Sequence, residues 1–428
     1  MKNLLKMFVA GILALVARAV LHRYRPHIVM ITGSVGKTAT KDAVAAVLAT
    51  RFLVRKSEKS FNSEFGVPFT ILDVENPWGN PFAWLSLVKC AVALLLLPNQ
   101  YPNMLVLEVG ADKPGDLAQI LRIATPDVVV VTRLPEVPVH VEAYASPEAV
   151  REEEFSPAYA LAAGAPLIIS ADDPYTLHNA VRTAAHIISY GVSSGATVRV
   201  SDGGFYEEGG KVVGMQANVT TGGLPAQAGK QERLVVKGSV GATQLLPAAS
   251  ALALASAFNI SPAEALKALE GYEPPPGRGR LLAGIHGSIV IDDSYNSSPA
   301  AVEEALATLK TFPAGRRIAV LGDMLELGRY SAMEHERIGA LAAESADVVV
   351  AVGIRARVFA ASAGEKAMLF DNAKNAAEAF PAFVKTGDVI LVKGSQSIRT
   401  ERIVEALLAD PSDISKLVRQ ESEWKRRT

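Results

Sequence analysis

The residues with the clearest chemical meaning lie near the start of the chain. An apolar run, Ile28 to Thr32, leads into a glycine turn that carries Lys37 and Thr38. Such a turn between a strand and a helix binds nucleotide phosphates, because its backbone N–H groups face the phosphate oxygens. Lys37 adds positive charge, and the Thr38 hydroxyl is placed to ligate Mg²⁺. The residues expected around the phosphates are Gly33, Ser34, Gly36, Lys37 and Thr38.

The bulk composition is that of a soluble enzyme with more than one domain. The chain has 428 residues, enough for two or three domains with full cores. Its net charge of −1 gives no reason to expect nucleic acid as a partner. The single cysteine, Cys90, cannot form an internal disulfide, and no His/Cys cluster has zinc spacing, so we expect a cytoplasmic protein.

Two stretches, residues 4–21 and 82–97, are unusually apolar. Neither is a comfortable membrane span, which needs about 20 apolar residues. The first ends in a basic flank that suits the cytoplasmic face of an anionic membrane. For residues 4–21, peripheral contact with the inner membrane face and burial against the first domain both stay open. For residues 82–97 we predict burial.

Short apolar runs alternate with helix-length segments, which predicts an α/β fold with parallel sheets. The expected strands are 28–32, 104–109, 127–132 and 167–170, and, further along, 288–292, 318–321, 348–352 and 389–392. Residues 196–240 are glycine-rich and polar, which predicts a peripheral antiparallel patch. A proline-rich link at 274–277 marks a boundary. We expect an N-terminal helix in 1–26, a phosphate-loop domain in 27–275 and a doubly wound, Rossmann-like domain in 276–428.

Polar clusters follow three of the strands expected in the second half of the chain. They are residues 292–296, 322–324 and 393–395. Ligands of parallel sheets bind at the carboxyl ends of the strands. Three polar clusters at corresponding places therefore predict a binding face there.

Taken in order, these motifs resemble the Mur ligases, ATP-dependent enzymes that form amide bonds in peptidoglycan synthesis. Asp-Asp-Ser-Tyr-Asn at 292–296 and Gly-Asp-Met-Leu-Glu-Leu-Gly at 322–328 are typical of the branch that joins D-alanyl-D-alanine to a muramoyl-peptide precursor. The other matching segments are Thr32 to Thr38, Asn62 to Pro68, Glu108 to Ala111, His140 to Glu142, Ala171 to Pro174, Gly279 to Leu281 and Lys393 to Glu401.

The resemblance implies a fold and a chemistry. The fold is a central phosphate-loop ATPase domain with a parallel sheet, followed by the Rossmann-like domain. The family makes an acyl phosphate from ATP, and an amine then displaces the phosphate. Lys37 would hold the phosphates, while Thr38 and Glu108 hold one Mg²⁺. His140 would help to hold a second Mg²⁺, and Arg280 would reach the γ-phosphate. The remaining assignments are Asp293 and Asn296 to the nucleotide, Lys393 and Ser395 to the incoming dipeptide, and Asn62 to substrate.

The sequence also departs from the family. A uridine-nucleotide domain precedes the phosphate loop in this branch, and here we expect it to be absent. The family's carbamylated lysine is replaced by Arg-Glu-Glu-Glu-Phe at 151–155. One of Glu152, Glu153 and Glu154 could supply that carboxylate, and we assign Glu154 as a metal ligand; the alternative is a solvated acidic helix face. The adenine-side motif is altered to Thr-Gln-Leu-Leu-Pro at 243–247, and the C-terminal motif has Gln396 in place of an arginine.

Two other functions stay open. One is a related amide ligase with a different acceptor, of the polyglutamate or folate-tail type. The other is a non-catalytic nucleotide-binding partner, in which the altered motifs would reflect decay.

Overall fold

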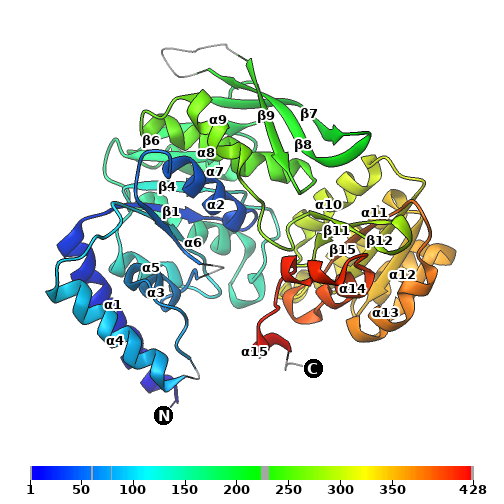
Figure 1. Ribbon diagram of the computed structural model, residues 1–428, viewed down its shortest axis with the longest axis horizontal. Coiled ribbons are helices and arrows are strands. Elements are labelled where there is room, and N and C mark those ends of the chain that lie inside the picture. The colour runs from blue at the N-terminus through cyan, green and yellow to red at the C-terminus, as the bar shows by residue number, and fades with distance from the viewer. Residues whose placement is uncertain (1, 59–60, 79, 223–230, 426–428) are drawn as a thin grey trace.

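The computed structural model describes residues 2–58, 61–78, 80–222 and 231–425, arranged around two β-sheets (Figure 1). The chain passes from one sheet to the other between residues 237 and 280. The predicted α/β class with parallel sheets is confirmed, and the predicted strands lie within two residues of their expected ends. The domain limits at 26 and 275 stay predictions.

The first sheet contains β1 His27–Thr32, β2 Val54–Lys56, β3 Met104–Glu108, β4 Val128–Val131, β5 Pro166–Ser170, β6 His186–Gly191, β7 Val198–Glu208, β8 Lys211–Thr221 and β9 Gln231–Lys237. Among the described residues its order is β2-β3-β1-β4-β5-β6-β7-β8-β9. Strands β1 to β6 are parallel, whereas β7, β8 and β9 pair antiparallel. The predicted antiparallel patch therefore extends one edge of the parallel sheet.

Helices cover both faces of this sheet. They are α1 Lys2–Tyr24, α2 Lys37–Leu48, α3 Gly66–Leu72, α4 Pro81–Leu96, α5 Asp116–Ile123, α6 Pro147–Tyr159, α7 Pro174–Ala180, α8 Ala242–Ala257 and α9 Pro262–Glu270. In β1, Val29 and Ile31 join the core under α2 and α8, while Ile28 and Met30 join the core on the other face. A parallel strand buried on both faces is a nearly continuous apolar run, so these strands can be predicted from the sequence.

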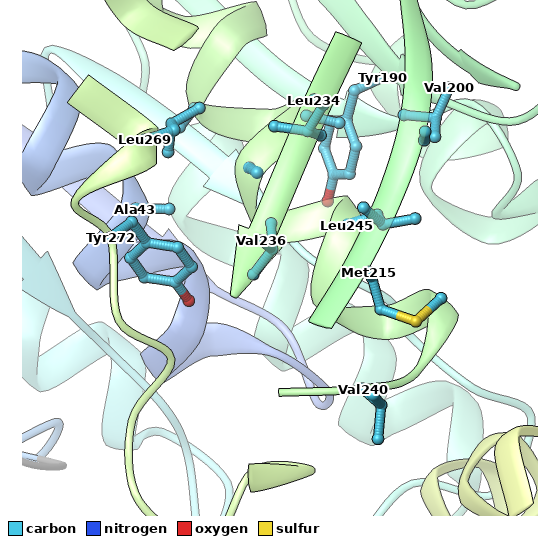
Figure 2. Packing of buried hydrophobic residues seen from close by; sticks show 14 of the residues in the cluster. Ala43, Tyr190, Val200, Met215, Leu234, Val236, Val240, Leu245, Leu269 and Tyr272 are labelled. Carbon is cyan, nitrogen blue, oxygen red and sulfur yellow. The ribbon is translucent and has the colours of Figure 1, made fainter. Parts of the chain in front are cut away.

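Helix α8 packs directly against α2. Its alanines at 248, 249, 251, 253 and 255 are each at most 1% exposed, and the helix contacts both α2 and the sheet. Figure 2 shows Leu245 of α8 among side chains from β8 and β9, with Tyr272 beside Ala43 of α2. The Tyr272 hydroxyl donates to the Ala39 carbonyl at 3.1 Å. Contacts with α8 and Tyr272 thus hold α2, the helix that follows the phosphate loop, in position.

The second sheet contains β10 Arg280–Ala283, β11 Ile289–Asp293, β12 Arg316–Gly322, β13 Val348–Val352, β14 Ala367–Phe370 and β15 Asp388–Lys393. Among the described residues its order is β10-β11-β15-β12-β13-β14, parallel except for β10. The helices of this half are α10 Pro299–Thr311, α11 Ser331–Ser345, α12 Arg357–Ala363, α13 Ala373–Ala379, α14 Glu401–Leu407 and α15 Ser422–Lys425. Side chains of α10 to α12 pack on one face of the sheet, and those of α13 and α14 on the other.

The two apolar stretches form α1 and α4, which lie side by side at the edge of the first unit (Figure 1). The predicted burial of residues 82–97 is only half right, because α4 buries Leu87, Ala91 and Leu94 but exposes the opposite face. Within α1, Lys6–Tyr24 is long and apolar enough to cross a membrane by length and composition. Leu13 and Val20 of the same helix are nevertheless buried against the domain.

Candidate active site

The phosphate loop joins the end of β1 to the start of α2. Gly33 has φ 114° and Gly36 has φ 89°, values that side chains disfavour. A Cβ on Gly33 would also lie 2.3 Å from Thr132 Oγ1. Lys37 opens α2, and its Nζ donates to the Gly33 carbonyl. Strand, turn and helix therefore have the arrangement that the motif predicts.

Glu108 ends β3 beside the first turn of α2, and its side chain is buried. Its Oε1 accepts a hydrogen bond from the Thr38 hydroxyl at 3.1 Å. Its Oε2 has no hydrogen-bond partner among the described residues and lies 3.7 Å from Lys41 Nζ. Burial raises the pKa of Glu108, and the charge of Lys41 opposes that rise. A carboxylate oxygen left without a donor, next to a hydroxyl, fits one Mg²⁺.

Of the three consecutive glutamates in α6, Glu154 faces the phosphate loop. It is 3% exposed, and its Oε2 accepts from Gly33 N–H at 3.2 Å and from the Thr32 hydroxyl at 3.0 Å. Its Oε1 lies 3.8 Å from Lys37 Nζ. The alternative of a solvated acidic face is therefore wrong for Glu154.

The other two glutamates have structural partners. Glu153 accepts from the N–H groups of Gly115 and Leu117 at 3.2 and 3.0 Å, which caps the start of α5. Glu152 accepts from the Tyr175 hydroxyl at 2.9 Å and pairs with a surface arginine. Within the described residues, neither glutamate forms a hydrogen bond or ion pair with the phosphate loop.

His140 lies at the start of the 3₁₀ helix Val141–Ala143, with φ 65°. Its Nδ1 lies 2.9 Å from Glu326 Oε2, which belongs to the second unit, and its Nε2 lies 3.6 Å from Asp112 Oδ1. Burial alone lowers the pKa of His140, but the bond and charge of Glu326, together with Asp112, outweigh it and the pKa is raised. A carboxylate at Nδ1 is the usual partner of a histidine that binds a metal through Nε2.

The expected metal ligands do not form one set. In the part of the chain that the structure describes, no three His, Cys, Asp or Glu side chains are grouped as a metal site. Thr38 and Glu108 are brought together, and Glu154 reaches Lys37 instead of joining them. Thr38 with Glu108 is thus the pair that fits a metal as it stands.

A cleft of about 730 Å³ separates the two units. Lys37, Thr38 and Glu108 line it from the first unit. Segments that follow β11, β12 and β15 line it from the second, so the predicted binding face meets the phosphate loop. Further lining residues are Asn62, His140, Asn296, Glu326 and Ser395.

A narrower cavity of about 50 Å³ adjoins this cleft and contains Lys393 and Asp293 in its lining. Lys393 is 1% exposed, and burial lowers its pKa. Its Nζ lies 2.6 Å from Asp293 Oδ2 and donates to the Asn296 carbonyl at 3.0 Å. Lys393 and Ser395, expected to face one dipeptide, therefore line different cavities. The same narrow cavity is lined by Gln244, whose buried Oε1 has no hydrogen-bond partner in the part of the chain that the structure describes.

Arg280, expected to reach the γ-phosphate, lies outside the linings of these two cavities. Arg280 begins β10, its guanidinium lies 3.5 Å from Glu273, and it lines neither cavity. Arg278 lines both cavities, with its guanidinium 4.2 Å from the centre of the Tyr295 ring. Sequence reasoning missed Arg278 because the Gly-Arg-Gly-Arg run offers two arginines in the same context. The two arginines differ in one respect, because only Arg278 has a glycine on each side. Only Arg278 lines the cleft.

Two family models match the chain. The Mur ligase middle domain matches residues 31–222. The Mur ligase glutamate ligase domain matches residues 277–396. The second match begins at Gly277 and therefore includes the turn that carries Arg278.

Curated relatives cover most of the chain. The UDP-N-acetylmuramoyl-tripeptide–D-alanyl-D-alanine ligase of Bacillus subtilis (strain 168) is 27% identical over 402 residues, spanning 92% of this chain and 79% of that protein. The enzyme of the same name from Mycobacterium tuberculosis (strain H37Rv) is 30% identical over 410 residues, spanning 90% and 73%. Among solved structures, the MurF ligase of Thermotoga maritima in complex with ADP aligns with a TM-score of 0.76 at 26% identity, covering 93% of this chain and 83% of that one.

The different positions of Arg278 and Arg280 give a direct test of which arginine binds phosphate. We expect Arg278→Ala to weaken binding of a nucleoside triphosphate about tenfold or more, because a charge-assisted contact to phosphate is lost. Arg280→Ala is the matched control and should bind as the unmodified protein does. Fluorescence titration with a labelled, non-hydrolysable ATP analogue measures both. Weaker binding in the Arg280 variant alone would restore the original assignment.

Proposed function

The chain belongs to the Mur ligase family, and we propose that it is an ATP-dependent ligase that joins D-alanyl-D-alanine to a muramoyl-peptide precursor. One observation carries the proposal. The cleft has the phosphate-loop lysine on one wall and residues of the Asp-Asp-Ser-Tyr-Asn and Gly-Asp-Met-Leu-Glu-Leu-Gly segments on the other. The names of the curated relatives support this choice of acceptor and precursor.

The proposed reaction has two steps. A carboxylate oxygen of the precursor attacks the γ-phosphorus of ATP, and ADP leaves. The amine of the dipeptide then attacks the acyl carbon, phosphate leaves, and the nitrogen loses a proton. Both steps gather negative charge at the phosphoryl group, so catalysis depends on positive charge placed beforehand. Lys37 and Arg278, which line the same cleft, would supply it.

For the metal, Thr38 and Glu108 would hold one Mg²⁺. When bound, Mg²⁺ neutralises charge on the phosphate oxygens. His140, oriented by Glu326, would offer Nε2 to a second ion, and Glu154 would take the place of the family's carbamylated lysine. What supports Glu154 is its burial and its position beside Lys37.

The remaining residues are assigned according to the cavity that each one lines or adjoins. Asn62 and Ser395 line the large cleft, where the precursor and dipeptide would meet. Asp293 with Lys393, and Asn296 beside them, would contact the nucleotide side. The unpartnered Oε1 of Gln244 can accept a hydrogen bond from an adenine amino group, which would compensate for the altered motif. We also propose a cytoplasmic location with peripheral contact at the inner membrane face through residues 4–21.

The first test is product formation. Purified protein with ATP and Mg²⁺ should convert UDP-muramoyl-tripeptide and D-alanyl-D-alanine to the pentapeptide product, identified by mass. Lys37→Ala should lower the rate about 10²-fold or more, because its charge acts on the transferring phosphoryl group. Lys211→Ala, an exposed lysine of β8, is the control.

Other outcomes of that assay separate the alternatives. Product with a glutamate acceptor instead of the dipeptide would favour the polyglutamate or folate-tail class. ATP binding with no turnover on any acceptor would favour a non-catalytic partner.

The metal pair predicts a change in Mg²⁺ dependence. Glu108→Gln should raise the Mg²⁺ concentration needed for half-maximal rate, and His140→Ala should do so as well. Glu148→Gln removes an exposed carboxylate from α6 and should leave that concentration unchanged. Rates measured over a Mg²⁺ titration decide the matter; if Glu108→Gln titrates like the control, Glu108 is structural.

The glutamate run predicts activity without CO₂. Glu154→Gln should lower the rate far more than Glu152→Gln, because only Glu154 reaches the phosphate loop. Bicarbonate should have no effect on the unmodified enzyme. Glu154→Lys should be inactive without bicarbonate and regain activity with it, since a carbamylated lysine again places a carboxylate there. Equal rates for the two glutamine variants would show that Glu154 has no special role.

A further inference from the structure

Helices α1 and α4 share an outward apolar face. It is formed by Phe8, Ile12 and Leu15 of α1 and by Leu85, Val88 and Val92 of α4, each between 46% and 66% exposed. Their spacings, i, i+4, i+7 and i, i+3, i+7, place each set of three along one side of its helix. Single exposed apolar residues are ordinary, but two adjacent helices with such stripes mark an interaction surface.

The inner sides of both helices are fastened to the protein. Leu13 and Val20 of α1, and Leu94 of α4, are at most 6% exposed. The Tyr24 hydroxyl donates to the Leu94 carbonyl at 2.8 Å, and Arg23 donates to the Leu97 carbonyl at 3.0 Å. Helix α1 therefore lies along the domain, with one side against it and the other outward. This geometry suits a helix lying in the plane of a surface and opposes one that crosses a bilayer.

The charge on these helices has one sign. Neither the 23 residues of α1 nor the 16 residues of α4 include Asp or Glu, although the whole chain is close to neutral at −1. Lys6, Arg18 and Lys89 are exposed on the two helices. Apolar side chains combined with basic ones are typical of helices that lie at the surface of a membrane with anionic lipids.

We propose that the apolar face of α1 and α4 docks the protein on a membrane surface that contains anionic lipid, with both helices in the plane of that surface. A second copy of the chain is the other occupant to consider. In such a dimer, basic side chains of the two copies would face each other, and neither helix offers an acidic partner. Charge repulsion therefore disfavours a dimer through this face. The inference deepens the peripheral membrane contact proposed above for residues 4–21, and it rests on this surface and not on the proposed ligation reaction.

The experiment uses the full chain and vesicles, without ATP. Co-sedimentation should occur with vesicles of equal parts phosphatidylcholine and phosphatidylglycerol, and only weakly with phosphatidylcholine alone. Replacing both Ile12 and Val88 with Gln should lower vesicle affinity about tenfold or more. Arg18→Glu combined with Lys89→Glu should weaken binding as strongly, with an effect that fades at high salt.

Matched controls keep the test sharp. Ile354→Gln changes a residue that is 76% exposed in the second unit and should leave binding unchanged. All substituted side chains are exposed, so thermal unfolding should be unaltered. Deleting α1 is a poorer test, because it would uncover the core that Leu13 and Val20 complete.

Three results would overturn the proposal. One is absence of vesicle binding by the full chain. Another is equal binding to neutral and anionic vesicles. The third is a lipid-free dimer, seen by analytical ultracentrifugation, that Ile12→Gln with Val88→Gln dissociates, because the face would then join two copies. Ligation activity enters none of these readouts, so failure of the proposed reaction is distinguished from failure of membrane docking.

Discussion

The close approach of residues 277–279 to both units is the constraint on which the cleft depends. A Cβ on Gly279 would lie 2.5 Å from the Val240 carbonyl oxygen, and one on Gly277 would lie 2.9 Å from Val418. Both glycines have positive φ, so a larger residue is excluded by conformation as well as by space. The turn that connects the two sheets is thereby held tightly against them. It presents Arg278 to the two cavities at the place where the phosphate loop meets the second unit.

Much of this architecture could be predicted from the sequence, for a physical reason. Parallel strands buried on both faces have few polar positions, so β1, β3 and β4 stand out as apolar runs. The glycine turn is equally legible, because few residues tolerate its backbone angles. Composition does not show which side of an apolar helix faces the core. Residues 82–97 are apolar except for Ser86 and Lys89, and only the packing decides that Leu87 faces inward while Val88 faces outward.

The glutamate run gives the same lesson at the scale of one helix turn. Consecutive helical residues point about 100° apart, so three neighbouring glutamates must face three directions. The sequence therefore implies that only one can serve the phosphate loop, but the choice depends on how α6 is rotated against β1. Burial of Phe155 next to Glu154 fixes that rotation, with its ring fully enclosed in the core beneath the sheet. An aromatic side chain thus selects which carboxylate faces the phosphate loop.

The alanines of α8 have a consequence for how the chain can vary. Small side chains let α2 approach α8 closely, and α2 begins with Lys37. An added methylene group at any of these fully buried alanines would have to displace a neighbouring element, at a cost of about 1–3 kcal/mol. A displacement of α2 would move the lysine ammonium relative to the loop. Mutational tolerance should therefore be as low in this buried helix as in the glycine turn itself.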